Sequence, residues 1–312
     1  MRQWKTARRL RPVVATVMLA ACGGGGDAGE TAARADSAAA ETASQSAPLS
    51  AAIVLTLDGL QAPEAARFDP ELGVYFVANI NGDPSAKDGN GYISRVTREG
   101  KVDSLKFIAS GRGGVKLNGP KGLAIRGDTL WVADIDAMRA FDKRSGKPIA
   151  TVDLAGKAKF LNDAAVGPDG AIYFTDTGAN VVYRVADGKA TVAVEFKDKP
   201  GPNGIVWDSA GSRFLIVPFG GTSIYSWAPG DSAPAVIAEG PGKMDGIEKV
   251  GDDRFAITSW TDSSLFVLQG DSITPLLGGL PSPADIALDA ERGRIAVPLL
   301  MEDRMEFVEL KR

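Results

Sequence analysis

A short segment that recurs along the chain at nearly constant intervals constrains the fold more than any other feature of this sequence. Its clearest copy is Pro202-Asn203-Gly204-Ile205-Val206-Trp207-Asp208, and altered copies lie before and after it. The second position of the six copies is occupied by Glu64, Lys121, Asn162, Asn203, Asp245 and Ala284. These positions are separated by 57, 41, 41, 42 and 39 residues. A period near 40 residues with several short strands in each unit is typical of β-propeller blades.

Each copy of the segment is followed by further short stretches rich in β-branched and aromatic residues, as expected of half-buried strands. The expected second strands of the repeats are 74–80, 130–135, 172–177, 214–219, 255–260 and 295–300. No stretch of helical length shows a sustained apolar period of 3.6 residues. We therefore predict an all-β fold made of four-stranded blades.

The last repeat ends before a fourth strand can form. Residues 53–57 precede Glu64 by the same interval at which residues 273–277 precede Ala284. An N-terminal strand can therefore supply the missing strand and close the ring, which leaves only short, protected sheet edges. The sequence predicts a six-bladed β-propeller over residues 51–312, with its last blade closed by the N-terminal strand.

Residues 1–21 have the pattern of a bacterial lipoprotein signal peptide. A basic segment is followed by the apolar stretch 13–21, which is too short to span a bilayer as a mature helix. Leu19-Ala20-Ala21-Cys22 then resembles a lipobox, in which the cysteine is acylated and becomes the new N-terminus. The alternative is an ordinary secretory signal with an incidental cysteine. Because Gly23 is not a retention signal of the aspartate type, we expect a lipid-anchored, periplasm-facing protein of the cell envelope, at the outer rather than the inner membrane.

The composition of the mature chain excludes some classes of function. Residues 22–50 lack aromatic side chains and are expected to form a disordered tether. The formal net charge of −4 becomes about −9 once the five basic residues of the signal are removed, and such an acidic chain repels nucleic acid. The single cysteine allows no internal disulfide, so the remaining ~260 residues must be stabilised by their own core. We expect a monomer that touches the membrane only through its lipid.

The polar residues at the repeated second position predict a metal site. In a propeller the innermost strands surround a central channel, so equivalent positions of successive blades face one small volume. Carboxylate and amide oxygens, without histidine or thiolate, form a hard set of donors that suits Ca²⁺ better than Zn²⁺. The candidate ligands are Glu64, Asn162, Asn203 and Asp245, with water or substrate in the remaining coordination positions.

Four elements in register resemble the gluconolactonase/regucalcin (senescence marker protein) family of six-bladed propellers. The resemblance covers residues ~52–310 and keeps the order and spacing of the family's elements. It is carried by Glu64 with Phe68-Asp69, by Asn162-Asp163, by Pro202-Asn203-Gly204 and by Asp245-Gly246.

The resemblance implies a divalent cation, usually Ca²⁺, that polarises a lactone carbonyl or a phosphoryl oxygen. Glu64, Asn203 and Asp245 would be its ligands, and Asn162 a fourth ligand or a substrate contact. Asp245 would also be the catalytic base that activates water. The alternative for any one of these residues is a polar side chain that caps the start of a blade and bonds to a neighbouring loop.

This chain departs from the family in three respects. It contains no histidine, so no histidine-assisted hydrolysis is available. Glu64 lies in Pro-Glu-Ala-Ala rather than Glu-Gly-Pro. Lys121 stands at the axial position of the second blade, where it either binds an anionic group of the substrate or pairs with Glu64 or Asp245.

The loops after the second strands are expected to ring the mouth of the site. They carry Asn81, Asp134, Asp136, Asp176, Phe219, Trp260, Asp262 and Glu302. Trp260, our candidate substrate contact, and Phe219 either stack on a ring-shaped ligand or pack between blades. The long loop 79–91 is either functional or a plain insertion.

Two functions of different classes remain open at this point. The first is a Ca²⁺-dependent hydrolase that acts on a small molecule, a lactone or a similar ester. The second is a lipoprotein propeller that keeps the metal for rigidity or ligand binding and catalyses nothing. A protein-interaction scaffold is the weakest alternative because the sequence shows no obvious apolar patch for a partner. Fold alone does not separate these functions.

Overall fold

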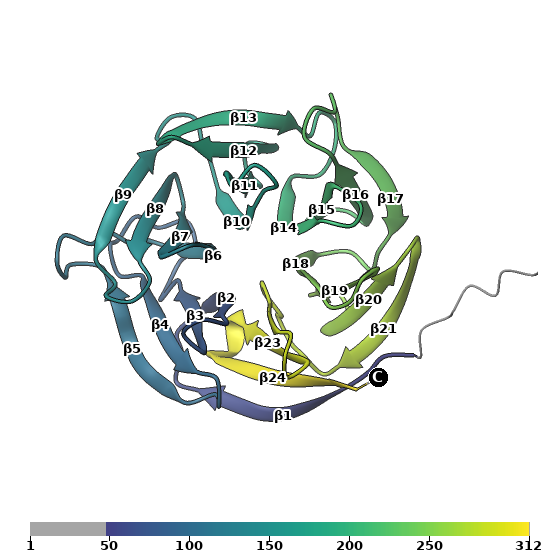
Figure 1. Cartoon of the computed structure of the whole chain (residues 1–312), viewed down its shortest axis with the longest axis horizontal. Helices are drawn as coiled ribbons and strands as arrows, with labels where there is room; N and C mark the ends of the chain where they lie inside the picture. The colour runs from purple at the N-terminus through teal and green to yellow at the C-terminus, as the bar shows by residue number, and fades with distance from the viewer. Residues whose placement is uncertain (1–47, 312) are drawn as a thin grey trace, which may run out of the picture. The chain divides into compact units, whose positions relative to one another are not determined.

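The computed structural model describes residues 48–311, which form six four-stranded antiparallel sheets arranged as blades around a central channel (Figure 1). The predicted six-bladed propeller is therefore confirmed. Blade 1 contains β2 (Pro63–Asp69), β3 (Val74–Asn79), β4 (Tyr92–Thr97) and β5 (Val102–Ala109). Blade 2 contains β6 (Pro120–Arg126), β7 (Thr129–Asp134), β8 (Ala137–Asp142) and β9 (Pro148–Asp153). Blade 3 contains β10 (Leu161–Val166), β11 (Ile172–Asp176), β12 (Val181–Ala186) and β13 (Lys189–Glu195).

The remaining blades follow the same order from the channel outward. Blade 4 contains β14 (Pro202–Asp208), β15 (Arg213–Pro218), β16 (Ser223–Trp227) and β17 (Ala235–Glu239). Blade 5 contains β18 (Met244–Lys249), β19 (Arg254–Ser259), β20 (Ser264–Gln269) and β21 (Ser272–Gly278). Blade 6 contains β22 (Ala287–Asp289), β23 (Arg294–Leu299), β24 (Arg304–Lys311) and β1 (Ser50–Asp58), with the short 3₁₀ helix η1 (Leu300–Glu302) between β23 and β24.

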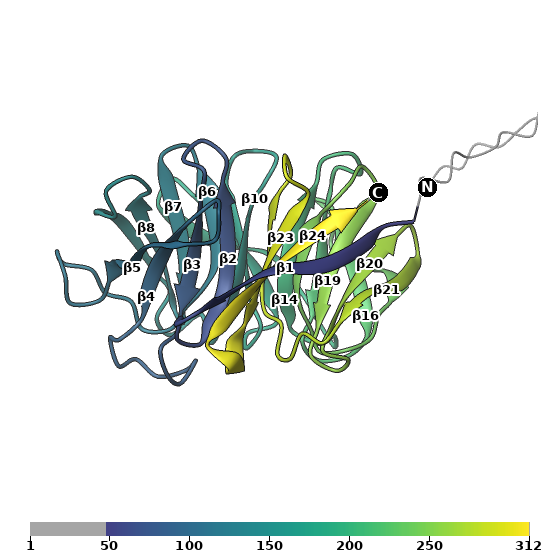
Figure 2. The same cartoon turned by 90° about the horizontal axis from the view of Figure 1, so that it is seen from below.

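The N-terminal strand closes the ring, as the sequence predicts. β1 pairs antiparallel with β24, from Ser50 opposite Lys311 to Asp58 opposite Arg304. The side view shows β1 running along the outside of the molecule beside β24 (Figure 2). The first and last segments of the propeller therefore share one sheet, and β1 supplies the outermost strand of blade 6.

Apolar side chains fill the spaces between neighbouring blades. Within residues 48–311, each of the six blade interfaces contains its own cluster of buried apolar residues. Between blades 3 and 4, for example, Tyr173 lies 4.6 Å from Phe214, measured between ring centroids. The core is thus a ring of interfaces, and each strand alternates between the two neighbouring blades.

A β-bulge interrupts five innermost strands at the same place. The register shifts span the repeated second position in β2, β6, β10, β14 and β18. A bulge adds a residue and re-aims the side chains on either side of it. This irregularity explains how Glu64 and Arg67, three residues apart on one strand, both turn toward the channel.

Glycine follows the second position in blades 2, 4 and 5 because the bulges of neighbouring blades touch there. A Cβ atom on Gly246 would lie 2.7 Å from the Cα atom of Asp285 in the next blade. A Cβ atom on Gly204 would overlap the carbonyl oxygen of Asp245 and lie 2.9 Å from a methyl group of Val217. The glycine of the Pro-x-Gly segment is therefore required by the close approach of the backbone of the next blade.

The signal peptide of residues 1–21, the acylation site Cys22 and most of the tether of residues 22–50 lie outside the described residues. The described part of the tether ends in β1, which begins at Ser50. Within residues 48–311, no helix is long and apolar enough to cross a membrane.

We predict that Gly204→Ala lowers the free energy of unfolding by about 1–3 kcal/mol or more, because the added methyl group meets backbone that cannot move aside. Gly220→Ala is the matched control: its Cβ atom would be 3.7 Å from the nearest atom, an ordinary contact. Urea unfolding of both variants measures the difference. Equal stability of the two variants would contradict the role given to the bulge.

Candidate functional site

The predicted site residues of the propeller lie in one cavity of about 320 Å³ at one end of the channel. Five of its lining residues come from the second position of successive innermost strands: Glu64, Lys121, Asn162, Asn203 and Asp245. Because the strands are antiparallel, the ends of the second strands meet the same cavity, and they supply Ile80, Thr177, Phe219, Trp260 and Leu300. Pro84 and Phe160 complete the lining. We call this space the site cavity.

Three oxygens in the site cavity are buried and have no hydrogen-bond partner: Glu64 Oε2, Asn203 Oδ1 and Asp245 Oδ1. The three residues are 5%, 3% and 6% exposed, respectively. Burying a polar group without a partner is costly, and most buried polar atoms in proteins are hydrogen-bonded. Three unpartnered acceptors from three different blades in one cavity therefore indicate that an electropositive group belongs there.

The two carboxyl groups of the site cavity disfavour ionisation in the absence of a cation. Burial raises the pKa of Asp245 to about 7, and the charge of Asp163 contributes. Burial also raises the pKa of Glu64 well above its usual range, and the negative charge of Asp245 raises it further, while Lys121 acts in the opposite direction. A bound divalent cation would reverse this balance, because it favours the ionised forms.

Asn162 is oriented by its neighbour Thr177. The amide nitrogen of Asn162 donates to Thr177 Oγ1 at 3.2 Å, and this hydroxyl donates to the carbonyl oxygen of Pro202 at 2.8 Å. With its nitrogen held in this way, the side chain of Asn162 presents its amide oxygen as the atom for a ligand. Asn162 therefore fits either of its predicted roles, as a fourth cation ligand or as a substrate contact.

Lys121 is held by backbone carbonyls. Its ammonium group donates to the carbonyl oxygens of Pro84 at 2.9 Å and Gly119 at 3.0 Å, and it lies 4.3 Å from the centre of the Phe160 ring. Within residues 48–311, no ion pair shorter than 4.0 Å joins Lys121 to Glu64 or Asp245, so the structure shows no direct pairing of these groups. Burial lowers the pKa of Lys121, and Glu64 partly offsets this effect.

The long loop after β3 contributes directly to the site cavity. Pro84 lines the cavity and holds Lys121 through its carbonyl oxygen. Lys87, farther along this loop, pairs with Asp136 at 2.5 Å in blade 2. The loop therefore joins two blades at the edge of the site cavity, and this position favours the functional alternative over a plain insertion.

Trp260 and Phe219 both line the site cavity and also contact each other. Their rings meet edge to face, with centroids 5.4 Å apart. The indole N–H lies close enough to Asp245 to lower the pKa of that carboxyl, yet it makes no hydrogen bond of good geometry. The two rings thus form an aromatic wall beside the candidate base.

Two of the acidic residues expected at the mouth are structural. Asp134 accepts from the backbone N–H groups of Asn118 and Gly119 and pairs with Arg139. Asp176 accepts from three backbone N–H groups of Lys159, Phe160 and Ala179. Both carboxylates hold the segments that lead into β6 and β10, next to Lys121 and Phe160. Neither lines the site cavity.

A second buried polar network fills the channel below the site cavity. Arg67 of blade 1 donates to the carbonyl oxygen of Leu123 at 2.8 Å and pairs with Glu248 at 2.7 Å and Asp285 at 3.4 Å. Its guanidinium group also lies 3.9 Å from Asp163, which accepts from the backbone N–H of Ile205. This network links all six blades, and sequence analysis did not identify it.

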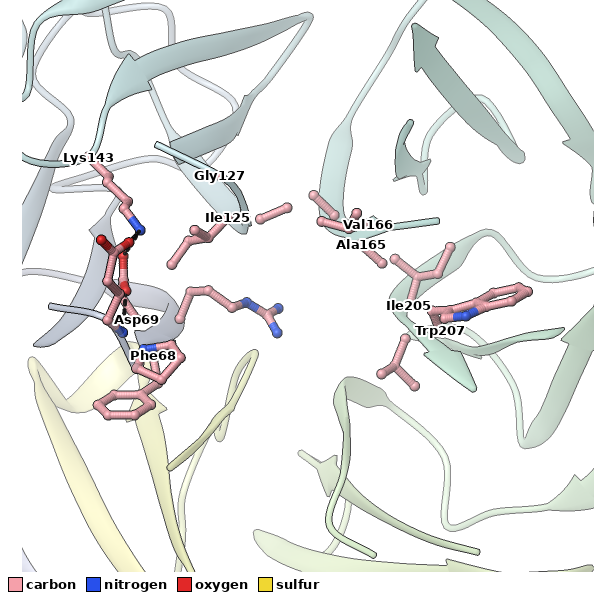
Figure 3. Close-up of a pocket in the computed structure, with 15 residues that line it drawn as sticks. Phe68, Asp69, Ile125, Gly127, Lys143, Ala165, Val166, Ile205 and Trp207 are labelled. Carbon is pink, nitrogen blue, oxygen red and sulfur yellow. Dashed lines mark hydrogen bonds and ion pairs between the residues drawn. The ribbon is translucent and has the colours of Figure 1, made fainter. Parts of the chain in front are cut away.

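A wider cavity of about 480 Å³ lies at the opposite end of the innermost strands (Figure 3). Its walls include Phe68, Ile125, Val166 and Trp207, and Asp69 at its edge is paired with Lys143 at 2.9 Å. The close-up shows Trp207 and Ile205 on one side, facing Phe68 and Asp69 on the other. The unpartnered acceptors Glu64, Asn203 and Asp245 are at the other end, so the smaller cavity is the better candidate for chemistry.

The donors of the site cavity fit a hard divalent cation. Within the described part of the chain, no three carboxylate, imidazole or thiol groups lie together in a way that could hold a metal ion by themselves. A cation here therefore depends on the amide oxygen of Asn203, with Asn162 available as well, in addition to Glu64 and Asp245. Ca²⁺ accepts such mixed sets of carboxylate, amide and water oxygens.

Comparison with known proteins supports the fold and its class. No protein-family model and no curated protein matches the sequence. Among solved structures, a protein assigned as a gluconolactonase is similar over 85% of this chain and 93% of its own, with 16% identity and a TM-score of 0.63. A streptogramin B lyase matches 85% of this chain and 98% of its own at 14% identity and a TM-score of 0.58. An inactive virginiamycin B lyase from Staphylococcus aureus with quinupristin covers 84% of this chain and 99% of its own at 15% identity and a TM-score of 0.58.

Fold and cavity together define a six-bladed propeller with gluconolactonase-like architecture. The resemblance of the sequence to the gluconolactonase/regucalcin family therefore agrees with the fold. At these identities, the structural likeness concerns the fold alone.

We predict that, in the presence of a chelator, Asp245→Asn becomes increasingly stable relative to the unchanged protein as pH rises from about 4 to about 7. An unfolded aspartate ionises near pH 3.9, whereas Asp245 in the folded protein ionises at about 7. Between these values the folded state binds more protons, so its stability falls with rising pH. The amide of the variant does not titrate and would not share this loss.

Thermal unfolding at several pH values measures this difference, which we expect to reach at least ~5 °C in Tm near neutral pH. Excess Ca²⁺ should abolish or reverse the difference, because it stabilises the carboxylate. A pH-independent difference between the two proteins in chelator would contradict the raised pKa that burial gives Asp245.

Proposed function

We propose that this protein is a divalent-cation-dependent hydrolase of a lactone or a similar ester, with Ca²⁺ as the favoured ion. The observation that carries the proposal is the convergence of three buried, unpartnered oxygens from blades 1, 4 and 5 in one cavity. Glu64, Asn203 and Asp245 would hold the cation, with Asn162 as a fourth ligand or a substrate contact. When bound, the cation would polarise the substrate carbonyl and offset the negative charge that develops on its oxygen.

Asp245 has the properties required of a general base. Its buried carboxyl group lines the site cavity, and a bound cation would hold it in the ionised form, which can accept a proton from water. In the hydrolysis, the water oxygen would bond to the carbonyl carbon and its proton would pass to an Asp245 oxygen. The bond between the carbonyl carbon and the ring oxygen would break, and the ring oxygen would take this proton from Asp245, which gives a hydroxy acid and restores the carboxylate. No histidine is needed for any of these transfers.

The other lining residues would orient the substrate and exclude water. Trp260 and Phe219 form a wall beside Asp245, and Phe160 lies on the side of Lys121. Removing water strengthens electrostatic interactions between the substrate and the charged groups. The positive charge of Lys121 favours the ionised form of Glu64.

We propose further that the protein acts in the cell envelope on the periplasmic side, as a monomer anchored through an acylated Cys22. The lipobox-like sequence Leu19-Ala20-Ala21-Cys22 supports this placement. An outer-membrane position remains our expectation. Mass spectrometry of the N-terminal peptide is the test: a diacylglyceryl group on Cys22 is expected, and an unmodified cysteine would exclude the anchor.

We predict that Asp245→Asn lowers kcat/KM on a hydrolysed lactone by at least about a hundredfold, because it removes the base and one cation ligand. Chelation of the unchanged protein should abolish turnover, and added Ca²⁺ should restore it. Asp262→Asn, the same substitution at an exposed position near the cavity mouth, is the matched control and should keep full activity.

A panel of lactones and aryl esters, assayed with and without chelator, is the measurement. Turnover that survives both Asp245→Asn and chelation would contradict the proposal. A protein that binds Ca²⁺ but hydrolyses no member of the panel would favour the second reading, a ligand-binding propeller without chemistry.

A further inference from the structure

We infer that the substrate of the site cavity is a small cyclic ester with an apolar body, and not a polyhydroxylated sugar lactone. This inference rests on the proposed hydrolase function and specifies its substrate class. It follows from the apolar contacts and the hydrogen-bond donors that the cavity wall provides for the body of the substrate, apart from its reacting carbonyl group.

Apart from the donors for the cation, Lys121 and Thr177, the lining of the site cavity is apolar. Six of the twelve lining residues are Ile80, Pro84, Phe160, Phe219, Trp260 and Leu300. They come from all the blades or from the loops beside them, so the apolar surface surrounds the polar floor. A ligand whose carbonyl reaches the floor must therefore place its remaining atoms against these side chains.

The other polar groups of the wall already have partners. The hydroxyl of Thr177 accepts from Asn162 and donates to the carbonyl oxygen of Pro202. The ammonium group of Lys121 donates to the carbonyl oxygens of Pro84 and Gly119. Among the lining residues that would not hold the cation, the indole N–H of Trp260 makes no hydrogen bond of good geometry, and Lys121 has a third N–H beyond its two hydrogen bonds to carbonyl oxygens.

This distribution discriminates against hydroxyl groups on the substrate. A hydroxyl moved from water into an apolar site without a partner lowers affinity by roughly tenfold or more. A sugar lactone carries several hydroxyl groups, and outside the residues that would hold the cation the wall leaves two donors for them, the indole N–H of Trp260 and the third N–H of Lys121. An alkyl or aryl substituent incurs no such penalty and gains from contact with Trp260, Phe219 and Phe160.

The cavity also limits the size of the substrate. Its volume of about 320 Å³ lies near the lower end of the ~300–1,000 Å³ range of small-molecule sites. The loop that carries Pro84 closes one side through the bonds of Lys121 and the ion pair of Lys87 with Asp136. A single ring with a short apolar substituent fits this space better than a long acyl chain.

The test compares two six-membered lactones of similar size: glucono-δ-lactone and a δ-lactone with a five-carbon alkyl substituent. We expect kcat/KM in Ca²⁺ to be at least about tenfold higher for the alkyl lactone. Equal or faster hydrolysis of glucono-δ-lactone would overturn the substrate class while leaving the hydrolase function intact.

Binding of the corresponding lactams, which resist hydrolysis, separates the two proposals. Calorimetry in Ca²⁺ should show tighter binding of the alkyl lactam than of the sugar lactam by at least about tenfold. If neither lactone is hydrolysed, this preference still supports the apolar site while the hydrolase function fails. Equal binding of the two lactams, or tighter binding of the sugar lactam, would overturn the inference.

A variant of the aromatic wall adds an internal comparison. Phe219→Ala should lower kcat/KM for the alkyl lactone by about tenfold and leave the value for the sugar lactone nearly unchanged. A merely structural role of Phe219 would lower both values equally, which would count against the inference. Val236→Ala, at a position 52% exposed on the outer strand β17, is the control and should change neither value.

Discussion

The close approach of neighbouring innermost strands governs the rest of this structure. Each bulge turns the residue at the repeated second position, and one farther along the strand, toward the channel. Where glycine follows the second position, the backbone of the next blade packs directly against it. Gly122, Gly204 and Gly246 occupy such positions. Without this approach the channel would be wider, and polar groups of different blades would not share one volume.

Buried carboxylates from different blades repel one another where they converge in the channel. The repulsion is offset in one way around Arg67 and in another way at the site cavity. Below the site cavity, the guanidinium group of Arg67 lies among the carboxylates of Asp163, Glu248 and Asp285. Burial raises the pKa of Asp285 well above its usual range, and the nearby charge of Asp163 adds to this, while Arg67 opposes it. At the site cavity no side chain of the described residues plays the part of Arg67, since Lys121 is turned toward backbone carbonyls. The network of Arg67 is internally paired and ties all six blades together at the axis, whereas the oxygens of the site cavity would be completed by a cation from solution. This contrast is the physical basis for assigning the chemistry to the smaller cavity.

Sequence reasoning succeeded where a repeat carries the information. The 40-residue period, the strand pattern and the interval before Glu64 together predicted six blades and the closing strand β1. The same period predicted that Glu64, Asn162, Asn203 and Asp245 would face one cavity, because equivalent positions of blades point to one axis.

Sequence reasoning failed where contacts depend on backbone details that the repeat does not contain. The bulge in β2 brings Arg67 to the channel, and no glycine marks it in the sequence, because Ala65 follows the second position there. The bond from Lys121 to the carbonyl oxygen of Pro84 depends on the path of a loop, and a backbone acceptor leaves no mark in the sequence. Asp134 and Asp176 were expected at the mouth, but N–H groups of nearby loops bind them instead.

The most direct test of this account is a crystal structure of the protein grown with excess Ca²⁺. The account predicts one ion in the site cavity, within about 2.3–2.6 Å of Glu64 Oε2, Asn203 Oδ1 and Asp245 Oδ1. A cavity that contains only water at these three oxygens under millimolar Ca²⁺ would contradict it.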